Sequence, residues 1–362
     1  MKILFLSKYS RQGASSRLRC LQYIPFLERS GVEVVVKSLF DDEYLNCLYS
    51  SGRRPVLRSI YCYLMRIFTI LTVRQYDMIW IEKEVLPFFP ATVERLLRAF
   101  APPFVVDYDD AIFHNYDVSS HSLIRKTLGK KIDVVMRNAR CVIAGNDYLA
   151  SRAKAAGAKD VVVVPTVVDK DRYLAKQDSA GESLVIGWIG SPSTQKYVVA
   201  IRQALLNACD EFGARVMLMG ATPQIVEELP GIPVEVLPWS ENGEVDFIRQ
   251  LDIGIMPLVD GPWEKGKCGY KLVQYMASGI PVVASPVGVN VEIVDGNRCG
   301  ILANSLLEWE SAFRQLLGNT DQRLNYGRAG REAVENKYTV HVQVAVLYKI
   351  FSRVVEQSSV KS

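Results

Sequence analysis

Three acidic residues follow one apolar segment in the stretch VVDYDDAIFH: Asp107, Asp109 and Asp110. The preceding residues Phe104–Asp107 have the composition of a buried strand, so the carboxylates come where the chain leaves a sheet. Adjacent carboxylates can orient sugar hydroxyls, act as a base or hold a cation. They can equally form an Asx turn that caps the next helix. Two histidines follow at 114 and 121 without a recognisable ligand spacing, and we interpret both as surface residues.

A second candidate is the loop SKYSRQGASSRLR, which follows the first strand. Gly13 and Ala14 permit a tight turn, and either of the next two serines can cap a helix whose free amides attract an anion. Arg17 and Arg19 add positive charge. The G-x-G-x-x-G dinucleotide fingerprint is absent. We expect a phosphate or acceptor loop here, with an ordinary βα turn carrying surface arginines as the alternative.

A third candidate opens the second half of the chain, in VIGWIGSPSTQKY. A strand leads into Gly190, Ser191, Ser193 and Thr194 before a helix. Small residues allow a phosphate to approach the backbone, and hydroxyl and amide groups can bind it. Lys196 follows within reach of the same place. We predict a donor-binding loop.

The fourth candidate is the helix in KCGYKLVQYMASGIPVVASPVG. Its spacing places Lys271, Gln274 and Tyr275 on one face, which we expect to be exposed. Packing explains the apolar residues of the other face, but it does not explain Lys267, Lys271 and Gln274 together. We predict that Lys267 and Gln274 bind the donor. The apolar face consists of Leu272, Val273, Met276 and Ala277.

The residues after this helix supply another loop at a strand end. Gly279 ends the helix, Pro281 prevents its continuation, and Ile280–Ala284 reads as a buried strand. The loop Ser285–Gly288 then leads to Glu292 near the start of a further helix. We predict that Gly288 and Glu292 contribute to donor binding.

The elements that must position these residues alternate between short apolar strands and helices. The uniformly apolar strands indicate parallel sheets covered on both faces. Helices are expected at 16–29, kinked at Pro25, and at 146–156. The expected strands are 3–7, 32–38, 78–81, 104–107, 141–144 and 161–164, then 184–189, 216–219, 234–237, 253–256, 281–284 and 300–302.

The pattern restarts near the middle, which predicts an α/β protein with two doubly wound domains. We expect a first domain at 1–169, a linker at 170–183, a second domain at 184–337 and a helix at 338–362 that returns to the first domain. Ligands bind beyond the carboxyl ends of strands in such sheets, so a cleft between the domains is the expected site.

These motifs resemble the GT-B-fold glycosyltransferases of family 4, which are retaining enzymes that use nucleotide sugars. The main likeness is KLVQYMASGIPVVASPVGVNVEIV, supported by GWIGSPST, DIGIMPL, VVVVPTVVDKDRY and GREAVENKYT. The resemblance implies a UDP- or GDP-sugar donor between two Rossmann-like domains, with no obligatory metal and no other cofactor. It places the diphosphate near Gly190–Thr194 and residues 285–288. It does not identify the donor sugar or the acceptor.

The sequence departs from the family pattern at the paired glutamates E-x7-E. Gln274 takes the second position and Gly266 the first, while Glu264 lies close enough to supply an acid from the loop. Lys271 matches the variant P-x-K-x-x-E-Y, which implies a lysine near the donor phosphates, and Trp188 replaces a usual arginine. We predict Lys271, Asp109 and Asp110 as catalytic residues, the two aspartates by their position where the family commonly has histidine.

Charge and composition limit the partners. The net charge of +4 over 362 residues is too small for a dedicated nucleic-acid binder. Arg53–Arg74 is apolar with five arginines and no acid, which fits a helix lying on an anionic membrane surface. The alternative is a core-packed helix pair with a solvated arginine face. A membrane location fits a lipid-linked acceptor, as in bacterial surface polysaccharide assembly.

The remaining features predict a cytoplasmic protein that can lie peripherally on the inner face of the plasma membrane. We interpret the seven cysteines as reduced, and we find neither a secretion signal nor an apolar window of spanning length. Two other functions stay open. One is a non-catalytic partner that binds nucleotide sugar, and the other, less favoured, is a GT-B-fold UDP-sugar epimerase.

Overall fold

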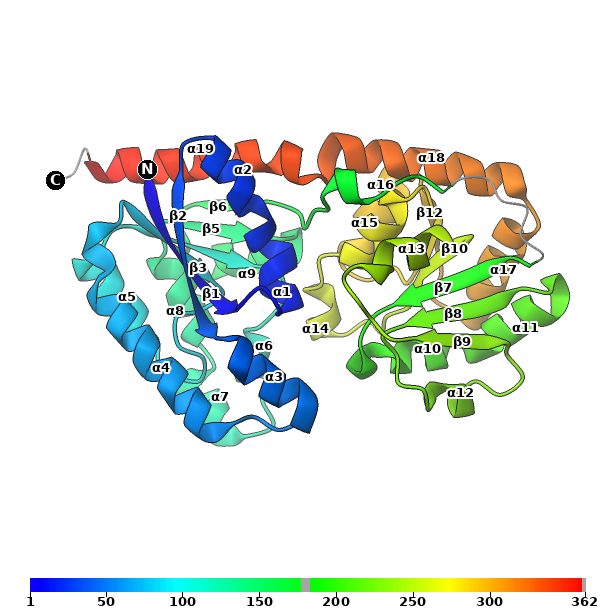
Figure 1. Ribbon diagram of the computed structural model, residues 1–362, viewed down its shortest axis with the longest axis horizontal. Coiled ribbons are helices and arrows are strands. Elements are labelled where there is room, and N and C mark those ends of the chain that lie inside the picture. Colours follow the sequence, from blue (N-terminus) through cyan, green and yellow to red (C-terminus); the bar gives the residue numbers. More distant parts are fainter. Residues whose placement is uncertain (177–182, 360–362) are drawn as a thin grey trace. The chain divides into compact units, whose positions relative to one another are not determined.

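The computed structural model describes residues 1–176 and 183–359 and divides the chain into two compact units (Figure 1). The first unit holds Met1–Thr166, Gly266–Cys268 and the chain from Val340 onward; the second holds Val167–Lys265 and Gly269–Thr339. The division thus falls after Thr166, before the expected linker. Residues 177–182 of that linker lie outside the described residues.

The first unit is built on a parallel six-stranded sheet of order β2-β1-β3-β4-β5-β6. Its central strands are buried on both faces, since Ile3 to Leu6 and Met78 to Ile81 expose no surface. The ring centroids of Phe5 and Trp80 lie 4.4 Å apart on neighbouring strands. The strands are β1 (Lys2–Tyr9), β2 (Glu33–Phe40), β3 (Met78–Glu82), β4 (Phe104–Tyr108), β5 (Cys141–Ala144) and β6 (Val161–Val163).

Helices cover this sheet, and the last one comes from the end of the chain. The helix α19, drawn in red in Figure 1, packs beside α2 and β3, with the rings of Phe351 and Trp80 5.2 Å apart. The helices of this unit are α1 (Ala14–Arg19), α2 (Ile24–Arg29), α3 (Asp42–Ser51), α4 (Val56–Leu71), α5 (Thr92–Phe100), α6 (His114–Asp117), α7 (Ser122–Leu128), α8 (Lys131–Asn138), α9 (Asp147–Ala155) and α19 (Val340–Ser359), with short 3₁₀ turns η1 (Leu21–Tyr23) and η2 (Val73–Gln75).

The expected single helix at 16–29 is instead two helices, α1 and α2, separated by η1. Pro25 stands in the first turn of α2, where its missing N–H costs no hydrogen bond, so it starts a helix and does not kink one. The helix expected at 146–156 is α9, and the side chain of Asn146 caps it by accepting from Leu149 N at 2.9 Å.

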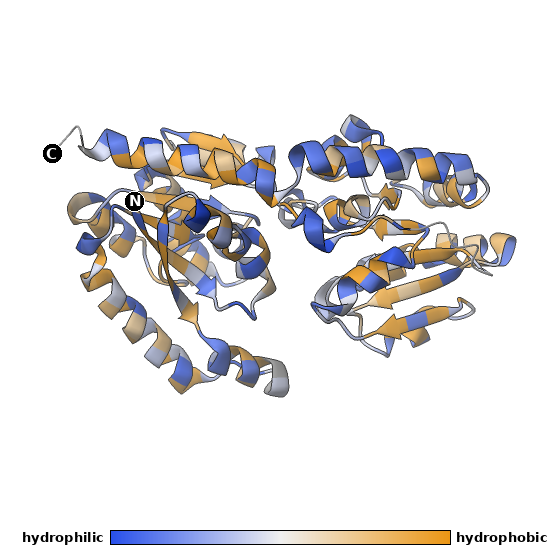
Figure 2. Ribbon diagram, turned by 45° about the horizontal axis from the view of Figure 1, so that its top comes forward, coloured by the Kyte–Doolittle hydropathy of each residue, from blue (hydrophilic) through white to orange (hydrophobic). Residues whose placement is uncertain are grey.

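The second unit repeats the architecture with a parallel sheet of order β12-β11-β10-β7-β8-β9. The strands of both sheets are largely hydrophobic along their length (Figure 2). The strands are β7 (Val185–Ile189), β8 (Arg215–Met219), β9 (Val234–Leu237), β10 (Ile253–Met256), β11 (Val282–Ala284) and β12 (Gly300–Leu302). The helices are α10 (Lys196–Ala200), α11 (Arg202–Phe212), α12 (Ile225–Glu228), α13 (Gly243–Arg249), α14 (Pro262–Lys265), α15 (Tyr270–Ala277), α16 (Asn290–Asn297), α17 (Leu306–Leu317) and α18 (Thr320–Lys337), with 3₁₀ turns η3 (Lys170–Arg172) and η4 (Pro192–Thr194).

Each sheet has one point at which the strand order reverses. In the first sheet β1 lies beside β3, and in the second β7 lies beside β10, so the chain winds away from these pairs in both directions. Ligands of doubly wound sheets bind beyond the carboxyl ends of the strands at such points. The loops after β1, β3, β7 and β10 are therefore where a site is expected.

The helix α4 differs from the alternative interpretation, in which its arginines form a solvated face. Arg66 is buried and donates from Nη2 to Ser7 O and Lys37 O, while Arg58 pairs with Asp41 and Glu43. The arginine face therefore points partly inward, because backbone carbonyls accept from Arg66 and two acids pair with Arg58. The side chains that face solvent are apolar, and we call them the α4 apolar surface: Val56, Leu57, Ile60, Tyr61, Leu64, Met65, Ile67, Phe68 and Leu71. None of the helices in the described part of the chain is long and apolar enough to cross a bilayer.

Candidate functional site

The site in the first unit is organised by Glu82, the last residue of β3. Its buried carboxylate accepts from Lys8 N at 2.8 Å and from Ser16 Oγ at 2.6 Å. Ser16 Oγ in turn accepts from Tyr9 N at 3.0 Å. The loop between β1 and α1 is thereby fixed to the neighbouring strand. Gly13 is required in it, because a Cβ there would lie 2.3 Å from Cβ of Tyr9.

Lys83 follows Glu82 and joins the two candidate aspartates. Its Nζ lies 2.8 Å from Asp109 Oδ1 and 3.9 Å from Asp110 Oδ2, and it donates to Ser15 Oγ at 2.9 Å. The residue is buried, and its φ of 68° is in the left-handed region that a non-glycine residue adopts at a cost. Such a conformation is retained where the surroundings enforce it, commonly at functional sites.

These charges shift one another's pKa values. Burial lowers the pKa of Lys83, but Asp109, Asp110 and Glu82 together raise it by more, so it lies above its ordinary value. Burial raises the pKa of Asp109, but the charge and hydrogen bond of Lys83 lower it by more, so it lies below its ordinary value. Burial and the charge of Asp109 raise the pKa of Asp110 to about 6. Asp110 is thus the carboxylate of this cluster best able to take up a proton near neutral pH.

The same geometry bears on cation binding. Asp109 and Asp110 are hard oxygen ligands of the type that Mg²⁺ and Ca²⁺ prefer. The ammonium group of Lys83 already supplies positive charge between them. The cluster therefore suits orientation of hydroxyl groups and proton transfer.

Two arginines expected to face a phosphate are buried in structural contacts. Arg19 pairs through Nε with Asp107 Oδ1 at 2.7 Å and donates from Nη1 to Val164 O at 2.8 Å. Arg17 donates from Nη1 to Arg11 O at 3.1 Å. The expected surface charge is wrong for both, because each guanidinium satisfies groups of the fold.

The expected serine cap of the first helix is also wrong. Gly13 is the residue before α1, and Ala14 begins the helix. The side chains of Ser15 and Ser16 face Glu82, which leaves the helix start without a side-chain cap. α1 has only 6 residues, so an anion site on its amino end has little support.

The sequence interpretation missed Glu82 and Lys83, although they organise the cluster. The available signal was the run EKE directly after an apolar strand, in IWIEKEV. A lysine after a strand normally indicates a solvent-exposed turn. Its pairing with aspartates 26 and 27 positions later depends on β3 and β4 being neighbours, which the sequence does not state.

In the second unit, Lys271 lies beside the loop that follows β7. Its Nζ is 4.4 Å from the ring centroid of Trp188, and a Cβ on Gly190 would lie 2.8 Å from that Nζ. Lys271 is half-buried in the first turn of α15. Tyr275 fixes the helix here, since its hydroxyl accepts from Ile189 N at 3.0 Å. The structure thus brings Lys271 and Gly190 together, although 81 positions separate them in the sequence.

The loop itself presents hydroxyl groups. Thr194 Oγ1 donates to Ser191 O at 3.0 Å and closes the turn η4, while the hydroxyls of Ser191 and Ser193 lie 3.0 Å apart and are exposed. Lys196 is exposed, with its Nζ 5.2 Å from the ring centroid of Tyr197. Small residues and hydroxyls near a lysine form a surface suited to phosphate.

The loop after β11 lies next to the one after β10. Ser285 Oγ accepts from Leu258 N at 2.9 Å, and a Cβ on Gly288 would lie 2.7 Å from Lys265 O. Gly288 also has a φ of 56°, so a side chain would be strained there. Glu292, in the first turn of α16, pairs with Lys337 Nζ at 2.6 Å, so its carboxylate is engaged with α18.

The expected exposed face of α15 is wrong for two residues. Gln274 is 2% exposed and donates from Nε2 to the hydroxyl of Tyr173 at 2.9 Å; Tyr275 is fully buried. The Tyr173 hydroxyl donates onward to the buried Glu244 at 3.1 Å. Gln274 therefore ties α15 to α13 through Tyr173. The helical period of 3.6 residues per turn predicts one buried face, whereas α15 is buried on more than one side. The burial of Gln274 and Tyr275 therefore did not follow from the sequence pattern.

Two further expectations involve the loop before α15. Lys267 falls in the short segment that belongs to the first unit, where its carbonyl accepts from Asn146 Nδ2 at 2.9 Å and its charge lowers the pKa of Asp110. Glu264 accepts a hydrogen bond from the Tyr197 hydroxyl. Lys267 thus joins the aspartate cluster, whereas Glu264 lies near Tyr197.

Residues 183–319 match the family model for Glycosyl transferases group 1. The second unit carries a glycosyltransferase domain. No curated protein matches the chain.

Solved structures similar to the whole chain support the GT-B fold, which has two Rossmann-like domains, each built on a parallel sheet. Sucrose-phosphate synthase from Thermosynechococcus elongatus has a TM-score of 0.73 at 14% identity, covering 99% of this chain and 100% of that one. HepE from Anabaena in complex with UDP-glucose has a TM-score of 0.70 at 17% identity, covering 98% and 100%. WaaG, a glycosyltransferase involved in lipopolysaccharide biosynthesis, has a TM-score of 0.67 at 12% identity, covering 96% and 99%.

Proposed function

We propose that the protein is a retaining glycosyltransferase of family 4. It moves a hexose-type sugar from a UDP- or GDP-sugar to a glycan or lipid-linked acceptor, in bacterial surface polysaccharide assembly. The observation that carries the proposal is Lys271 beside Gly190 at the strand-order reversal of the second sheet. The family match covers this place, and the titles of similar structures mention UDP and UDP-glucose.

Lys271 is assigned to the leaving diphosphate. Glycosyl transfer builds negative charge on the phosphate that departs, and a positive group in place before reaction stabilises that charge. The ring of Trp188 holds the Lys271 ammonium near Gly190. Ser191, Ser193 and the exposed Lys196 supply further donors for the phosphates.

Asp110 is assigned to the acceptor hydroxyl. Its raised pKa lets it take a proton near neutral pH, while Lys83 keeps Asp109 ionised to accept hydrogen bonds from sugar hydroxyls. Gln274 is not assigned to the donor directly, because its side chain is buried against Tyr173. It positions α15 and so Lys271.

The substitution of both family glutamates favours a second candidate, a nucleotide-sugar-binding subunit without catalysis. Gly266 cannot replace an acid, and Gln274 carries no charge. A GT-B-fold epimerase is less favoured, because it would need acid and base groups that the second unit offers sparsely.

Two measurements test the proposal. A panel of nucleotide sugars in a thermal-shift assay identifies the donor, because a ligand that binds only the folded state raises its stability. Turnover with that donor is then compared between the native protein and Lys271→Ala. We expect kcat to fall about 10²–10³-fold, the usual effect of losing one transition-state donor.

The control for this substitution is Lys265→Ala, which removes an exposed lysine that pairs with Asp260 on the loop before α15. We expect it to keep its turnover. Near-native turnover in Lys271→Ala would reject the assigned role. Donor binding without any transfer or hydrolysis in the native protein would favour the non-catalytic subunit.

The α4 apolar surface supports peripheral membrane association. Arg53 and Arg54 are exposed just before this helix, and no acid occurs in residues 53–76. Apolar side chains flanked by arginines suit the interface of an anionic bilayer. We include a membrane surface among the proposed partners, and the acceptor would then be lipid-linked.

A further inference from the structure

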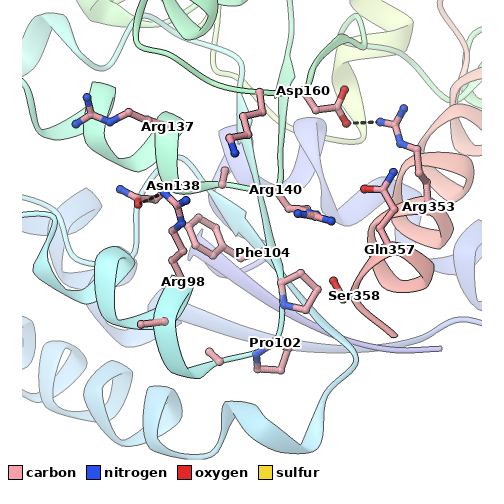
Figure 3. Close-up of a pocket in the computed structure, with 15 residues that line it drawn as sticks. Arg98, Pro102, Phe104, Arg137, Asn138, Arg140, Asp160, Arg353, Gln357 and Ser358 are labelled. Carbon is pink, nitrogen blue, oxygen red and sulfur yellow. Dashed lines mark hydrogen bonds and ion pairs between the residues drawn. The ribbon is translucent and has the colours of Figure 1, made fainter. Parts of the chain in front are cut away.

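A cavity of about 930 Å³ lies in the first unit, away from the candidate site (Figure 3). It is lined by the end of α5, the end of α8 and the last turns of α19, together with residues that precede β4, β5 and β6. It therefore opens at the amino edge of the sheet. The Lys83 cluster lies at the carboxyl edge of the same sheet, so the cavity is no part of it.

The lining of this cavity is strongly cationic. Among the described residues, five basic side chains line it, and the one acid is Asp160, which pairs with Arg353. Arg98 donates from Nη1 to the neutral Asn138 Oδ1 at 2.9 Å. The basic residues are Arg98, Arg137, Arg140, Lys159 and Arg353.

Most of this positive charge lacks a counter-charge. Within residues 1–176 and 183–359 no ion pair is formed by Arg98, Arg137, Arg140 or Lys159. The Nε atom of Arg140 is buried and has no hydrogen-bond partner in that part of the chain. A buried guanidinium N–H without a partner costs free energy that a bound acceptor would recover. Arg98, Arg137 and Lys159 are exposed, so water screens their mutual repulsion, and a bound anion would accept charge-assisted hydrogen bonds from them.

We propose that this cavity is a second anion site and binds a phosphate-bearing ligand. Phosphate carries about −1.5 to −2 charges at pH 7 and accepts forked hydrogen bonds from guanidinium groups, so one or two phosphates balance the cavity better than a carboxylate does. The ligand is either a free phosphorylated molecule or the head group of an anionic lipid. Neither source depends on the proposed glycosyl transfer.

Exposed apolar residues near the cavity are the reason to test a lipid head group as the phosphate-bearing ligand. Ala99 of α5 and Ala101, just after this helix, line the cavity, and Phe100 between them is 66% exposed. Arg74, just beyond α4, donates from Nε to Phe100 O at 3.2 Å. The cavity thus lies near the end of the α4 apolar surface.

Inorganic pyrophosphate is the first probe, titrated by calorimetry into the full-length protein. Arg137→Gln/Lys159→Gln removes two exposed cations of the cavity, so the fold should persist. We expect the pocket-dependent binding to weaken about tenfold or more, since charge-assisted hydrogen bonds are the strong ones. Arg95→Gln/Lys154→Gln makes the same change of charge on α5 and α9 outside the cavity, and we expect it to bind as the native protein does.

Asp160→Asn tests the same site in the opposite direction. It removes the only acid among the described residues that line the cavity and releases Arg353, so pyrophosphate should bind several-fold more tightly. Cosedimentation with vesicles containing anionic phospholipid provides the second arm. Loss of cosedimentation in the cavity variant but not in the Arg95/Lys154 control assigns the site to a lipid head group. Pocket-dependent pyrophosphate binding without such a loss assigns it to a free phosphorylated molecule. If the cavity variant matches the control in both arms, the proposal is wrong.

Discussion

Lys83 is the residue on which the first-unit cluster depends, because it neutralises Asp109 and approaches Asp110. We predict that Lys83→Met lowers kcat about 10²-fold or more, the effect of losing a preorganised charge. Loss of the positive charge raises the pKa of both carboxyls, so the acidic limb of the pH–rate profile should move to higher pH. The profile and kcat are measured with the donor found in the thermal-shift panel.

The matched control for Lys83 is Lys131→Met. Lys131 is also buried and pairs with a glutamate, Glu84, but it lies outside the cluster. Breaking that pair should cost about 3–5 kcal/mol of stability while the folded fraction keeps its kcat. Equal kcat losses in the two variants would show that Lys83 acts only through stability.

Asp110 and Asp109 should respond to pH with opposite signs. The pKa of Asp110 rises from 3.8 to about 6 on folding, so its ionisation destabilises the folded protein. This cost is absent below the unfolded pKa, grows between pH 3.8 and about 6, and is complete above that. Asp110→Asn should therefore raise Tm at pH 7.5 and change it little at pH 4. Because a third of the side chain is exposed, we expect only about 2–4 °C.

Asp109→Asn is the control with the opposite expected sign. The pKa of Asp109 is lowered in the folded protein, so its ionised form stabilises the fold, and that stability is lost as pH falls through the lowered pKa. The substitution should lower Tm at pH 7.5. Melting curves of both variants at pH 4 and pH 7.5 test these signs. Equal shifts of Tm with the same sign in both variants would contradict the assigned ionisation states.

At the scale of elements, α4 is an amphipathic helix whose apolar side faces solvent. Arg66 is buried on the side that packs against the unit, and the side chains of the α4 apolar surface are exposed. We predict that Leu57→Ser/Leu64→Ser/Phe68→Ser abolishes flotation with anionic vesicles, because it removes apolar area that would enter the bilayer interface. Each of these side chains is at least half exposed, so stability should change little.

Two further variants make the flotation test specific. Arg53→Gln/Arg54→Gln should weaken binding to anionic vesicles by about 1 kcal/mol per residue and leave neutral vesicles unaffected. Arg58 is unsuitable, because it pairs with Asp41 and Glu43 within the unit. A serine triple in the second unit should float like the native protein; its positions are Leu174, Val259 and Leu307, all exposed. Flotation of the α4 triple-serine variant like the native protein would show that the α4 apolar surface is not the membrane contact.

At the scale of the whole molecule, the sheets were predictable and the site was only partly so. All twelve expected strands are present within a few residues, because strands buried on both faces are apolar throughout and Gly or Pro often marks their ends. Lys271 lies beside Gly190, and the family resemblance had placed both near the donor phosphates without predicting their contact. Lys83 and the inward turn of Arg19 and Arg66 were not, because each depends on which strands and helices become neighbours. From the sequence alone, a charged residue is predicted to be exposed, because the distant residue that pairs with it in the fold is not known.

The return of the last helix to the first unit leads to the final prediction. Phe351 of α19 is fully buried and packs on Trp80, so the first unit is completed by residues more than 170 positions after Thr166. Phe351→Ala should cost about 3–5 kcal/mol, the usual range for a buried phenylalanine. Because the loss falls in one unit, hydrogen exchange should rise in β1 and β3 and stay unchanged in β7 and β10. Tyr348→Ala, on an exposed position of the same helix, should leave exchange unchanged throughout. Faster exchange in both units alike would mean that they unfold as one cooperative body.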